Sequence, residues 1–346
     1  MSIIKNVLLL TDPQSDFLQQ TIWKGLVKIL GSEHVITMPT IQHFYGGVDN
    51  WYILDDGKRG LTEAPKHLIA ESDPGWTQEQ ILEHLGDFDL MILCSARRYA
   101  LAALDTIRQQ SMPKPPLVAL CGEDYSWAPI NEEIISRYRP KAFFKRELDR
   151  QIEGVYPLPF GAFIDSYPEV DDSQKTYSVF ASFGITWPSR MELLKRLEAM
   201  RLPNAILATN TDQIPEGSTL RPMLGYEDYL RAIAQSKITF VMRGFGRTTL
   251  RDWEAPAWKT CVFWSDPGTI IPHPFQDGIH VVKYNESLDG LEQRIEYYLT
   301  HDEEREAIAL AGKTHTLKYH TVESRAAYLL EISERVIAKS KHHILV

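Results

Sequence analysis

The sequence predicts an α/β fold with parallel sheets covered by helices, and two observations support this prediction. Short apolar runs alternate with longer amphipathic segments from one end of the chain to the other, which is the pattern of parallel strands joined by helices. At 346 residues, the chain is also longer than one ordinary hydrophobic core supports. We therefore expect two domains of comparable size.

In the first half of the chain, the apolar runs predict strands at residues 4–10, 35–38, 90–94, 117–120, 142–144 and 155–158. Amphipathic segments predict helices between them at residues 16–30, 77–85, 99–110 and 131–137. The first run could be mistaken for a signal peptide, but Asp12 and Asp16 follow at once and no small-residue cleavage site appears. We interpret it as the first strand.

The texture of the sequence changes after Pro157, where a proline- and glycine-containing stretch leads into an acidic, serine-containing one, as expected of a linker. We place the domains at residues 1–165 and 166–346. In the second domain, strands are predicted at 177–181, 205–208, 238–242, 261–264 and 280–282. Helices are predicted at 189–200, 226–235, 248–258, 288–300, 302–319 and 321–338, and the last of them could pack back on the first domain.

These elements predict two Rossmann-like domains in series, with their parallel sheets facing an inter-domain cleft. Open parallel sheets bind ligands at the carboxyl ends of their strands, so this cleft is the expected site.

Composition excludes several classes of function. The formal net charge of -9 argues against a general nucleic-acid binder, whose affinity would rest on Lys and Arg. No apolar run approaches the roughly 20 residues needed to span a bilayer. Cys94, Cys121 and Cys261 lie far apart in apolar runs, which indicates a reduced cytoplasmic protein with neither disulfides nor a zinc cluster.

Common catalytic and phosphate-binding motifs are missing from the sequence. The first strand leads into Thr-Asp-Pro-Gln-Ser-Asp instead of a dinucleotide glycine loop, and neither a Walker sequence nor a Gly-x-Ser-x-Gly elbow occurs. Asp87-Phe88-Asp89 formally matches a metal-binding Asp-x-Asp, but it precedes a strand, whereas ligands gather after strands. We interpret it as a solvated turn and His342-His343 as a frayed tail, so no metal site is expected.

The most informative stretch follows the strand at 238–242. Arg243, Gly244, Gly246 and Arg247 form a loop, and a helix is expected to open at Thr248 or Thr249. Glycines allow the backbone to approach a ligand, while arginines and a helix N-terminus attract anions. The loop therefore predicts a site for a phosphate-bearing ligand. The alternative is a simple turn, followed by an exposed ion pair between Arg251 and Glu254, which stand three residues apart on one helix face.

Two further candidates also follow strands. Gly184 ends one strand and Arg190 opens the next helix, although a glycine in this place is usually just a turn. In the first domain, Glu123 and Asp124 place two carboxylates after a strand, where one could act as a general base. The alternative for such carboxylates is turn formation and helix capping, which we favour for Asp16.

The segment 225–330 resembles the C-terminal domain of bacterial GT-B glycosyltransferases, in the branch of the spore-maturation-type proteins. The matching pieces are Gly-Tyr-Glu-Asp-Tyr-Leu at 225–230, Arg-Asp-Trp-Glu-Ala at 251–255, Asp-Gly-Ile-His-Val-Val-Lys-Tyr at 277–284, Tyr-Tyr-Leu at 297–299, Glu304-Arg305, Ala311-Gly312 and His-Thr-Val-Glu-Ser-Arg at 320–325. Upstream, Phe-Lys-Arg-Glu-Leu at 144–148 and Leu-Pro-Phe-Gly at 158–161 look like the segment before the hinge in these proteins.

The resemblance implies transfer of a sugar from UDP- or another nucleoside-diphosphate sugar, without an obligatory metal or other cofactor. The acceptor would be a glycan, a lipid-linked sugar, a protein or a small molecule. The donor would lie mostly on the second domain. Its ribose would bind Glu254, and its nucleobase would lie near Tyr226. Its diphosphate would meet Arg243 and Arg247 beside the helix end, and Gly184 and Arg190 would face the phosphates from another loop. The other predicted donor-site residues are Gly244, Thr248 and Arg251. Glu123 or Asp124 would orient or deprotonate the acceptor.

One position departs from the family pattern. Many retaining members carry a second glutamate eight positions before the ribose-binding one, and Gly246 stands at that position here. This position leaves open whether the transfer would retain or invert the configuration of the sugar. It also leaves open one alternative function, a non-catalytic sugar- or nucleotide-binding or assembly protein. A separate alternative is a sugar-nucleotide epimerase or phosphorylase on the same two-domain frame.

Overall fold

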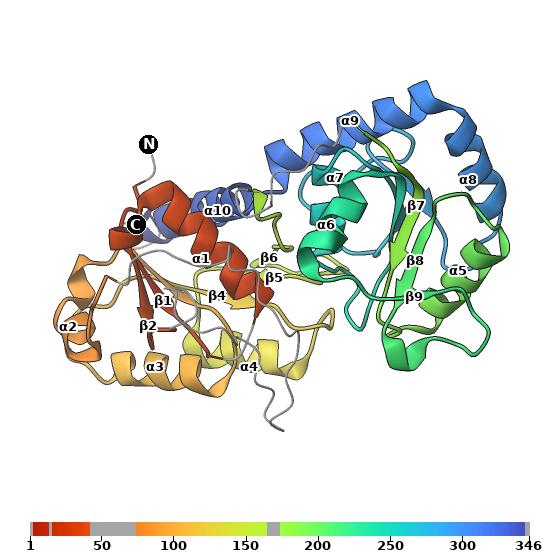
Figure 1. Cartoon of the computed structure of the whole chain (residues 1–346). Helices are drawn as coiled ribbons and strands as arrows, with labels where there is room; N and C mark the ends of the chain where they lie inside the picture. Colours follow the sequence, from red (N-terminus) through yellow and green to blue (C-terminus); the bar gives the residue numbers. More distant parts are fainter. Residues whose placement is uncertain (1–2, 14–15, 42–73, 165–173, 343–346) are drawn as a thin grey trace. The chain divides into compact units, whose positions relative to one another are not determined.

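The computed structural model describes residues 3–13, 16–41, 74–164 and 174–342. The chain divides into two compact units, shown in Figure 1. Unit 1 comprises Met1–Gly161, Thr269–Pro272 and Val322–Val346, and unit 2 comprises Ala162–Gly268 and His273–Thr321. Each unit is built around one parallel sheet.

The sheet of unit 1 has six parallel strands in the order β2-β1-β3-β4-β5-β6. The strands are β1 (Val7–Leu10), β2 (Val35–Met38), β3 (Leu90–Leu93), β4 (Leu117–Cys121), β5 (Phe143–Lys145) and β6 (Val155–Pro157). The helices are α1 (Phe17–Leu30), α2 (Gln78–Glu83), α3 (Arg98–Arg108), α4 (Pro129–Tyr138) and α10 (Val322–His342), with short 3-10 turns at Ser32–His34 and Leu85–Asp87. Strands β1, β2 and β3 are buried along their whole length, as expected where helices cover both faces of a sheet.

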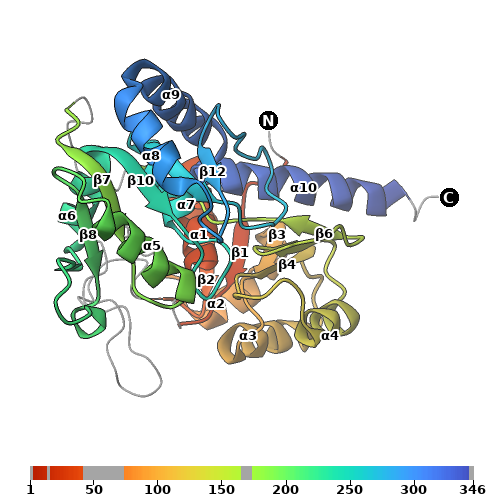
Figure 2. The same cartoon turned by 90° about the vertical axis from the view of Figure 1, so that its right-hand side faces the viewer.

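Helix α10 completes the core of unit 1 by packing along α1. The two helices meet at Gly25, where a Cβ atom would overlap the carbonyl of Val322 and lie 2.8 Å from the Cβ of Ala326. An ion pair between Lys28 and Glu323 also joins them. Figure 2 shows α10 as one continuous helix. Unit 1 is therefore made from the first and the last segments of the chain.

Unit 2 repeats the architecture with six parallel strands in the order β12-β11-β10-β7-β8-β9. They are β7 (Tyr177–Ser182), β8 (Ile206–Thr209), β9 (Arg221–Pro222), β10 (Ser236–Val241), β11 (Cys261–Ser265) and β12 (Val282–Tyr284). The helices are α5 (Pro188–Ala199), α6 (Tyr226–Ala234), α7 (Arg251–Ala257), α8 (Leu291–Thr300) and α9 (Asp302–Tyr319), with a 3-10 turn at Thr211–Gln213. Strands β7 and β10 lie side by side in the middle of this sheet, and their carboxyl ends carry the loops of interest.

The predicted fold class, two α/β units with parallel sheets, is confirmed. The predicted start of a helix at Thr248 or Thr249 is wrong, because α7 begins at Arg251. The backbone N–H and the hydroxyl of Thr249 both donate to the Asp252 carboxylate, at 2.7 and 2.9 Å, and Thr249 thereby stays outside the helix. Among the described residues, no helix is both long and apolar enough to cross a membrane.

Candidate functional site

The glycine loop after β10 lies against the loop after β7. Within it, the N–H of Gly244 donates to the carbonyl of Gly246 at 3.0 Å, which makes a tight turn with Phe245 at its exposed tip. A Cβ atom on Gly244 would lie 3.1 Å from Nη2 of Arg190 and 3.3 Å from the hydroxyl of Thr186. Glycine at position 244 thus allows the two loops to approach each other.

Arg190, in the first turn of α5, ties these loops together. Its guanidinium donates to the carbonyls of Gly184, Met242 and Arg243 at 2.8, 3.0 and 2.7 Å, and to the Thr186 hydroxyl at 3.1 Å. Burial, with a further contribution from the positive charge of Arg251, lowers the pKa of Arg190 to about 10. The site thus holds a cation in a place that disfavours positive charge.

Two more arginines of the site rest on aromatic rings. Arg243 lies over Trp187, with its guanidinium carbon 3.9 Å from the ring centre. Arg251 lies 4.9 Å from the ring centres of Phe183 and Tyr229, and its Nε donates to the Tyr229 hydroxyl at 2.8 Å. Stacking of this kind orients the guanidinium without neutralising its charge.

These arginines lack acidic partners. Within the part of the chain that the structure describes, no carboxylate lies at ion-pair distance from Arg190, Arg243 or Arg251. Arg247 contacts the carbonyl of Gly268 through Nη1 at 3.3 Å. Arg190 in the first turn of α5, Arg243 in the glycine loop and Arg251 at the start of α7 create a field that favours an anion, and guanidinium groups match phosphate oxygens.

Glu254 is one of two buried carboxylates on α7, and hydroxyl groups hold it. Oε1 accepts the hydroxyl of Tyr226 at 2.9 Å, and Oε2 accepts that of Tyr229 at 3.4 Å. The two tyrosine rings stack with their centres 6.0 Å apart. Burial raises the pKa of Glu254, although the Tyr226 hydrogen bond and the charge of Arg251 oppose the shift. A carboxylate in this setting can accept the hydroxyl groups of a ligand.

Asp252 fixes the start of α7. Besides accepting the two hydrogen bonds of Thr249, its carboxylate accepts the indole N–H of Trp264 on β11 at 2.6 Å. Burial raises the pKa of Asp252, while these hydrogen bonds lower it. The residue therefore links the glycine loop to the neighbouring strand, and Thr248 lies buried beside it.

The structure brings seven of the nine predicted donor-site residues into two contact groups in unit 2, and Arg247 and Thr248 lie outside these groups. Arg190 contacts the loops that contain Gly184, Arg243 and Gly244. Tyr226, Arg251 and Glu254 all meet at Tyr229. Three aromatic residues that contact the arginines and Glu254 were not predicted as site residues, namely Phe183, Trp187 and Tyr229. Of these three, only Tyr229 could have been predicted from the sequence, because it follows Tyr226 by three residues and therefore lies on the same helix face.

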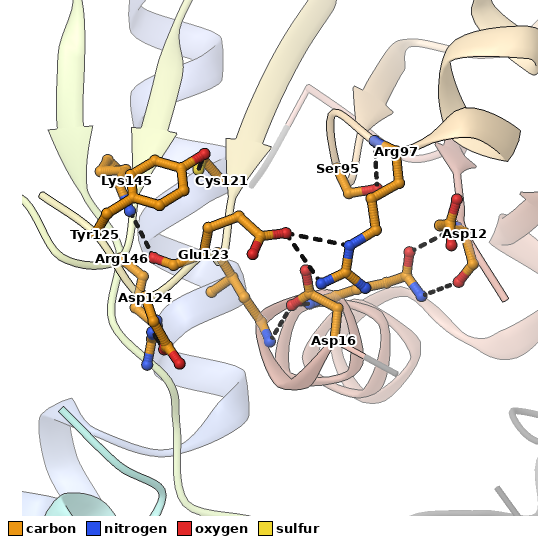
Figure 3. A network of polar contacts seen from close by, with 12 residues as sticks. Asp12, Asp16, Ser95, Arg97, Cys121, Glu123, Asp124, Tyr125, Lys145 and Arg146 are labelled. Atoms are coloured by element: carbon orange, nitrogen blue, oxygen red, sulfur yellow. Dashed lines mark hydrogen bonds and ion pairs between the residues drawn. The ribbon is translucent and has the colours of Figure 1, made fainter. Parts of the chain in front are cut away.

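Unit 1 has a second polar cluster, shown in Figure 3, at the carboxyl ends of β1, β3, β4 and β5. Glu123 lies in the loop after β4 and accepts Nε and Nη2 of Arg97 on its Oε1 atom, at 3.1 and 3.0 Å. The Nζ atom of Lys145, at the end of β5, donates to the backbone carbonyl of Glu123 at 2.8 Å. Arg97 and Lys145 were not predicted as site residues.

The other predicted carboxylate, Asp124, forms an ion pair with Arg146. Arg146 is buried, also pairs with Glu147 at 3.2 Å, and lies over the ring of Phe160. Asp124 itself is more than half exposed, with 55% of its side chain accessible. In the structure, Asp124 compensates the charge of the buried Arg146.

Asp12 and Asp16 bind backbone N–H groups. Asp16 caps α1 by accepting the N–H groups of Leu18 and Gln19 at 2.8 and 3.2 Å, which confirms the predicted capping role. Asp12 accepts the N–H of Tyr99 at 3.1 Å. Burial raises the pKa of Asp16, and the charge of Arg97 is the largest influence that lowers it.

In the described part of the chain, no group of three or more His, Cys, Asp or Glu side chains is placed to hold a metal ion. Asp89 of the Asp-x-Asp sequence accepts the backbone N–H groups of Lys5 and Asn6 at 2.8 and 2.9 Å, so it closes a turn before β3. His343 of the C-terminal histidine pair lies outside the described residues.

The second half of the chain is similar to a known protein family. Residues 178–331 match the family described as glycosyl transferase-like. No curated protein sequence matches the chain.

Solved structures resemble the chain over almost its whole length. Anabaena HepE in complex with UDP-glucose shares 12% identity, with 97% of this chain and 100% of that chain covered and a TM-score of 0.60. A Rickettsia africae glycosyltransferase shares 12% identity over 96% of this chain and 99% of that chain, with a TM-score of 0.59. Sucrose-phosphate synthase from Thermosynechococcus elongatus shares 12% identity over 97% and 100%, with a TM-score of 0.51. The chain thus has the GT-B fold, with two parallel six-stranded sheets, and residues 178–331 are similar to the glycosyl transferase-like family.

Proposed function

We propose that this protein is a glycosyltransferase that moves a sugar from a UDP-sugar or a related nucleotide sugar to a hydroxylated acceptor. The glycosyl transferase-like domain supports the reaction class. The choice of UDP is supported by the likeness to HepE, a structure that contains UDP-glucose. The motifs at 225–230, 251–255 and 320–325 support a place in the spore-maturation-type branch.

One observation carries the proposal: among the described residues, no carboxylate lies at ion-pair distance from three arginines beside the loops after β7 and β10. A diphosphate between Arg190, Arg243 and Arg251 would supply the missing negative charge, and we propose that Gly184, Gly244, Arg247 and Thr248 complete its site. Glu254 would accept the ribose hydroxyls, and Tyr226, which holds Glu254, would lie beside the nucleobase.

In this mechanism, the arginines stabilise the nucleoside diphosphate as negative charge develops on its leaving oxygen. They take the place that a divalent ion fills in other transferases, and we therefore propose that the reaction needs no metal. The fixed rings beneath Arg243 and Arg251 mean that little reorganisation is needed as the charge develops.

On the acceptor side, we propose that Glu123 or Asp124 orients or deprotonates the acceptor hydroxyl. The acceptor classes named above, a glycan, a lipid-linked sugar, a protein or a small molecule, all offer such a hydroxyl. A cytoplasmic location is also a proposal, and it rests on three free, buried cysteines.

Calorimetry with UDP and other nucleoside diphosphates tests the donor site. We expect wild type to bind UDP and Arg247→Ala to bind it about 10- to 100-fold more weakly, as expected for one lost charged hydrogen bond. Arg196→Ala is the matched control, because Arg196 pairs with Glu192 on α5 instead of lying in the loop. A wild-type protein that binds no nucleoside diphosphate would exclude the proposed function.

Gly246 favours a second candidate, because the glutamate that many retaining relatives keep at this position is absent. This second candidate is a protein that binds a nucleotide sugar without transferring it. Product analysis with donor alone and with acceptors separates the candidates: transfer needs an acceptor, an epimerase changes the donor by itself, and a binding protein does neither.

A further inference from the structure

The side chains of three charged residues of unit 1 lie next to one another, as Figure 3 shows. Asp16 is buried at the start of α1, Arg97 follows β3, and Glu123 follows β4 with 38% of its side chain exposed. Burial opposes the charge of Arg97, but Asp16 and Glu123 outweigh burial and raise the pKa of Arg97. Arg97 therefore stays charged and joins a buried carboxylate to an accessible one.

Glu123 is fixed at both its side chain and its main chain. Two N–H groups of Arg97 converge on Oε1, and the ammonium group of Lys145 holds the backbone carbonyl. Lys145 is buried and lies over the ring of Tyr125, and burial lowers its pKa. Glu123 is therefore held by two cations, one from the loop after β3 and one from the end of β5, which an ordinary surface turn does not require.

The fixed carboxylate keeps one oxygen for a ligand. Across the described residues, the hydrogen bonds to the Glu123 carboxylate all reach Oε1, and none reaches Oε2. We propose that Arg97 is a positioning residue that aims Oε2 of Glu123 at the acceptor hydroxyl. This inference rests on the proposed function and selects Glu123, not Asp124, as the residue that touches the acceptor.

The surroundings of Glu123 and Asp124 explain this choice. The charged and titratable groups that interact with Glu123 are Asp16 at the start of α1, Arg97 after β3, Tyr125 in its own loop and Lys145 at the end of β5. Asp124 instead neutralises Arg146, whose guanidinium is buried. Moving Asp124 toward a substrate would weaken that compensation, whereas Oε2 of Glu123 can accept a hydroxyl without losing the Arg97 contact.

The step that follows transfers the proton with the sugar. The acceptor oxygen forms a bond to the anomeric carbon while the bond from that carbon to the β-phosphate oxygen breaks. The electron pair of the broken bond leaves with UDP, and the hydroxyl proton passes to Oε2 of Glu123. The acceptor group is thus a hydroxyl that reaches the carboxylate of Glu123.

The test is a double-mutant cycle. UDP release from UDP-glucose is measured with water and with a panel of neutral sugars as acceptors, for wild type, Arg97→Gln, Glu123→Gln, the double variant and Arg97→Lys. We expect each glutamine variant to lower the rate about 100-fold and the double variant to be no slower than Glu123→Gln, since Arg97 acts through Glu123. Arg97→Lys keeps the charge and should recover part of the rate.

Two controls accompany the cycle. Arg137→Gln removes another arginine–carboxylate pair of unit 1, at 2.9 Å from Asp105, and should keep the wild-type rate. Affinity for UDP should stay unchanged in every variant, since the donor residues lie in unit 2. Thermal unfolding identifies a variant that fails to fold, in which case Arg97→Lys carries the comparison.

Three outcomes would overturn the assignment: an Arg97→Gln variant with the wild-type rate, a double variant slower by the full product of the single effects, or a wild-type protein that binds UDP but turns over UDP-glucose with none of the acceptors. A wild-type protein that does not bind UDP contradicts the proposed function itself, so the two failures are distinguishable.

Discussion

The two units place arginines at the carboxyl ends of similar sheets but treat their charge in opposite ways. In unit 2, Arg243 and Arg251 rest on aromatic rings, and Arg190 donates to carbonyls and a hydroxyl. In unit 1, Arg97 pairs with Glu123, and Arg146 pairs with Asp124 and Glu147.

This difference indicates what each unit can bind. Arginines without acidic partners attract an anionic ligand, because the ligand supplies the missing charge. Paired arginines are compensated within the protein and instead fix the positions of carboxylates that can meet hydroxyl groups. The same residue type at equivalent places in two similar sheets therefore predicts a diphosphate site in unit 2 and an acceptor site in unit 1.

The largest expected effect is that of Arg190→Gln. The variant loses four hydrogen bonds from a charged donor, each worth about 1.5 kcal/mol or more, and the relief of burying that charge offsets part of the loss. We expect the free energy of unfolding to fall by about 3 kcal/mol. Chemical denaturation measures it, with Arg196→Gln as a control. A change below about 1 kcal/mol would show that Arg190 does not hold the two loops together.

Glu254→Gln separates function from stability. We expect turnover of a nucleotide sugar to fall about 100-fold, because an amide accepts ribose hydroxyls less well than a carboxylate. Because burial raises the pKa of Glu254, its contribution to stability is present below its unfolded value of 4.5 and is lost as the pH rises through the raised value. Thermal unfolding at neutral pH should therefore show the variant to be as stable as wild type or more stable. A variant that is less stable only at neutral pH contradicts this sign.

Gly122→Ala tests the packing beneath the paired arginine of unit 1. A Cβ atom there would lie 2.5 Å from Oδ1 of Asp16, the cap of α1. We expect a loss of about 2 kcal/mol in the free energy of unfolding, since either the cap or the β4 loop must move. Gly86→Ala is the control, because nothing lies within 4 Å of a Cβ atom at that position. Equal effects of the two substitutions would contradict the contact.

Gly244→Ala applies the same change to unit 2, where the expected effect is smallest. The new methyl group would lie 3.1 Å from the end of the Arg190 side chain, which can shift by a few tenths of an ångström. We expect a stability loss of about 1 kcal/mol and weaker UDP binding, measured by denaturation and calorimetry. A larger loss than that of Gly122→Ala would reverse the order predicted for the two regions.

Much of the fold could be predicted from the sequence because strands buried on both faces leave continuous apolar runs. Strand β9 escaped notice, since it has two exposed residues, Arg221 and Pro222, and exists only through pairing with β8. The start of α7 was misplaced because the Asp252 side chain holds Thr249 outside the helix. Neither case leaves a periodic signal.

The site could be predicted only where its residues share a loop or a motif. Arg243, Gly244 and Arg247 stand together in the sequence, and Glu254 follows closely. Arg97 belongs to no motif, and its partner Glu123 lies 26 positions away. In the sequence, Lys145 follows the apolar residues of a strand and carries no sign of a role in the site. The parallel register of β4 and β5 brings it beside the Glu123 loop. Contacts between separate strands of this kind require the tertiary structure.

The placement of α10 also has a consequence for biosynthesis. A ribosome makes the chain from the N-terminus, and domains generally fold as units in that order. Here, the helix that covers Gly25 of α1 is translated only after every residue of unit 2. Unit 2, although second in the sequence, is therefore the first unit whose residues are all available to fold, and the apolar face of α1 is covered only after α10 has been translated.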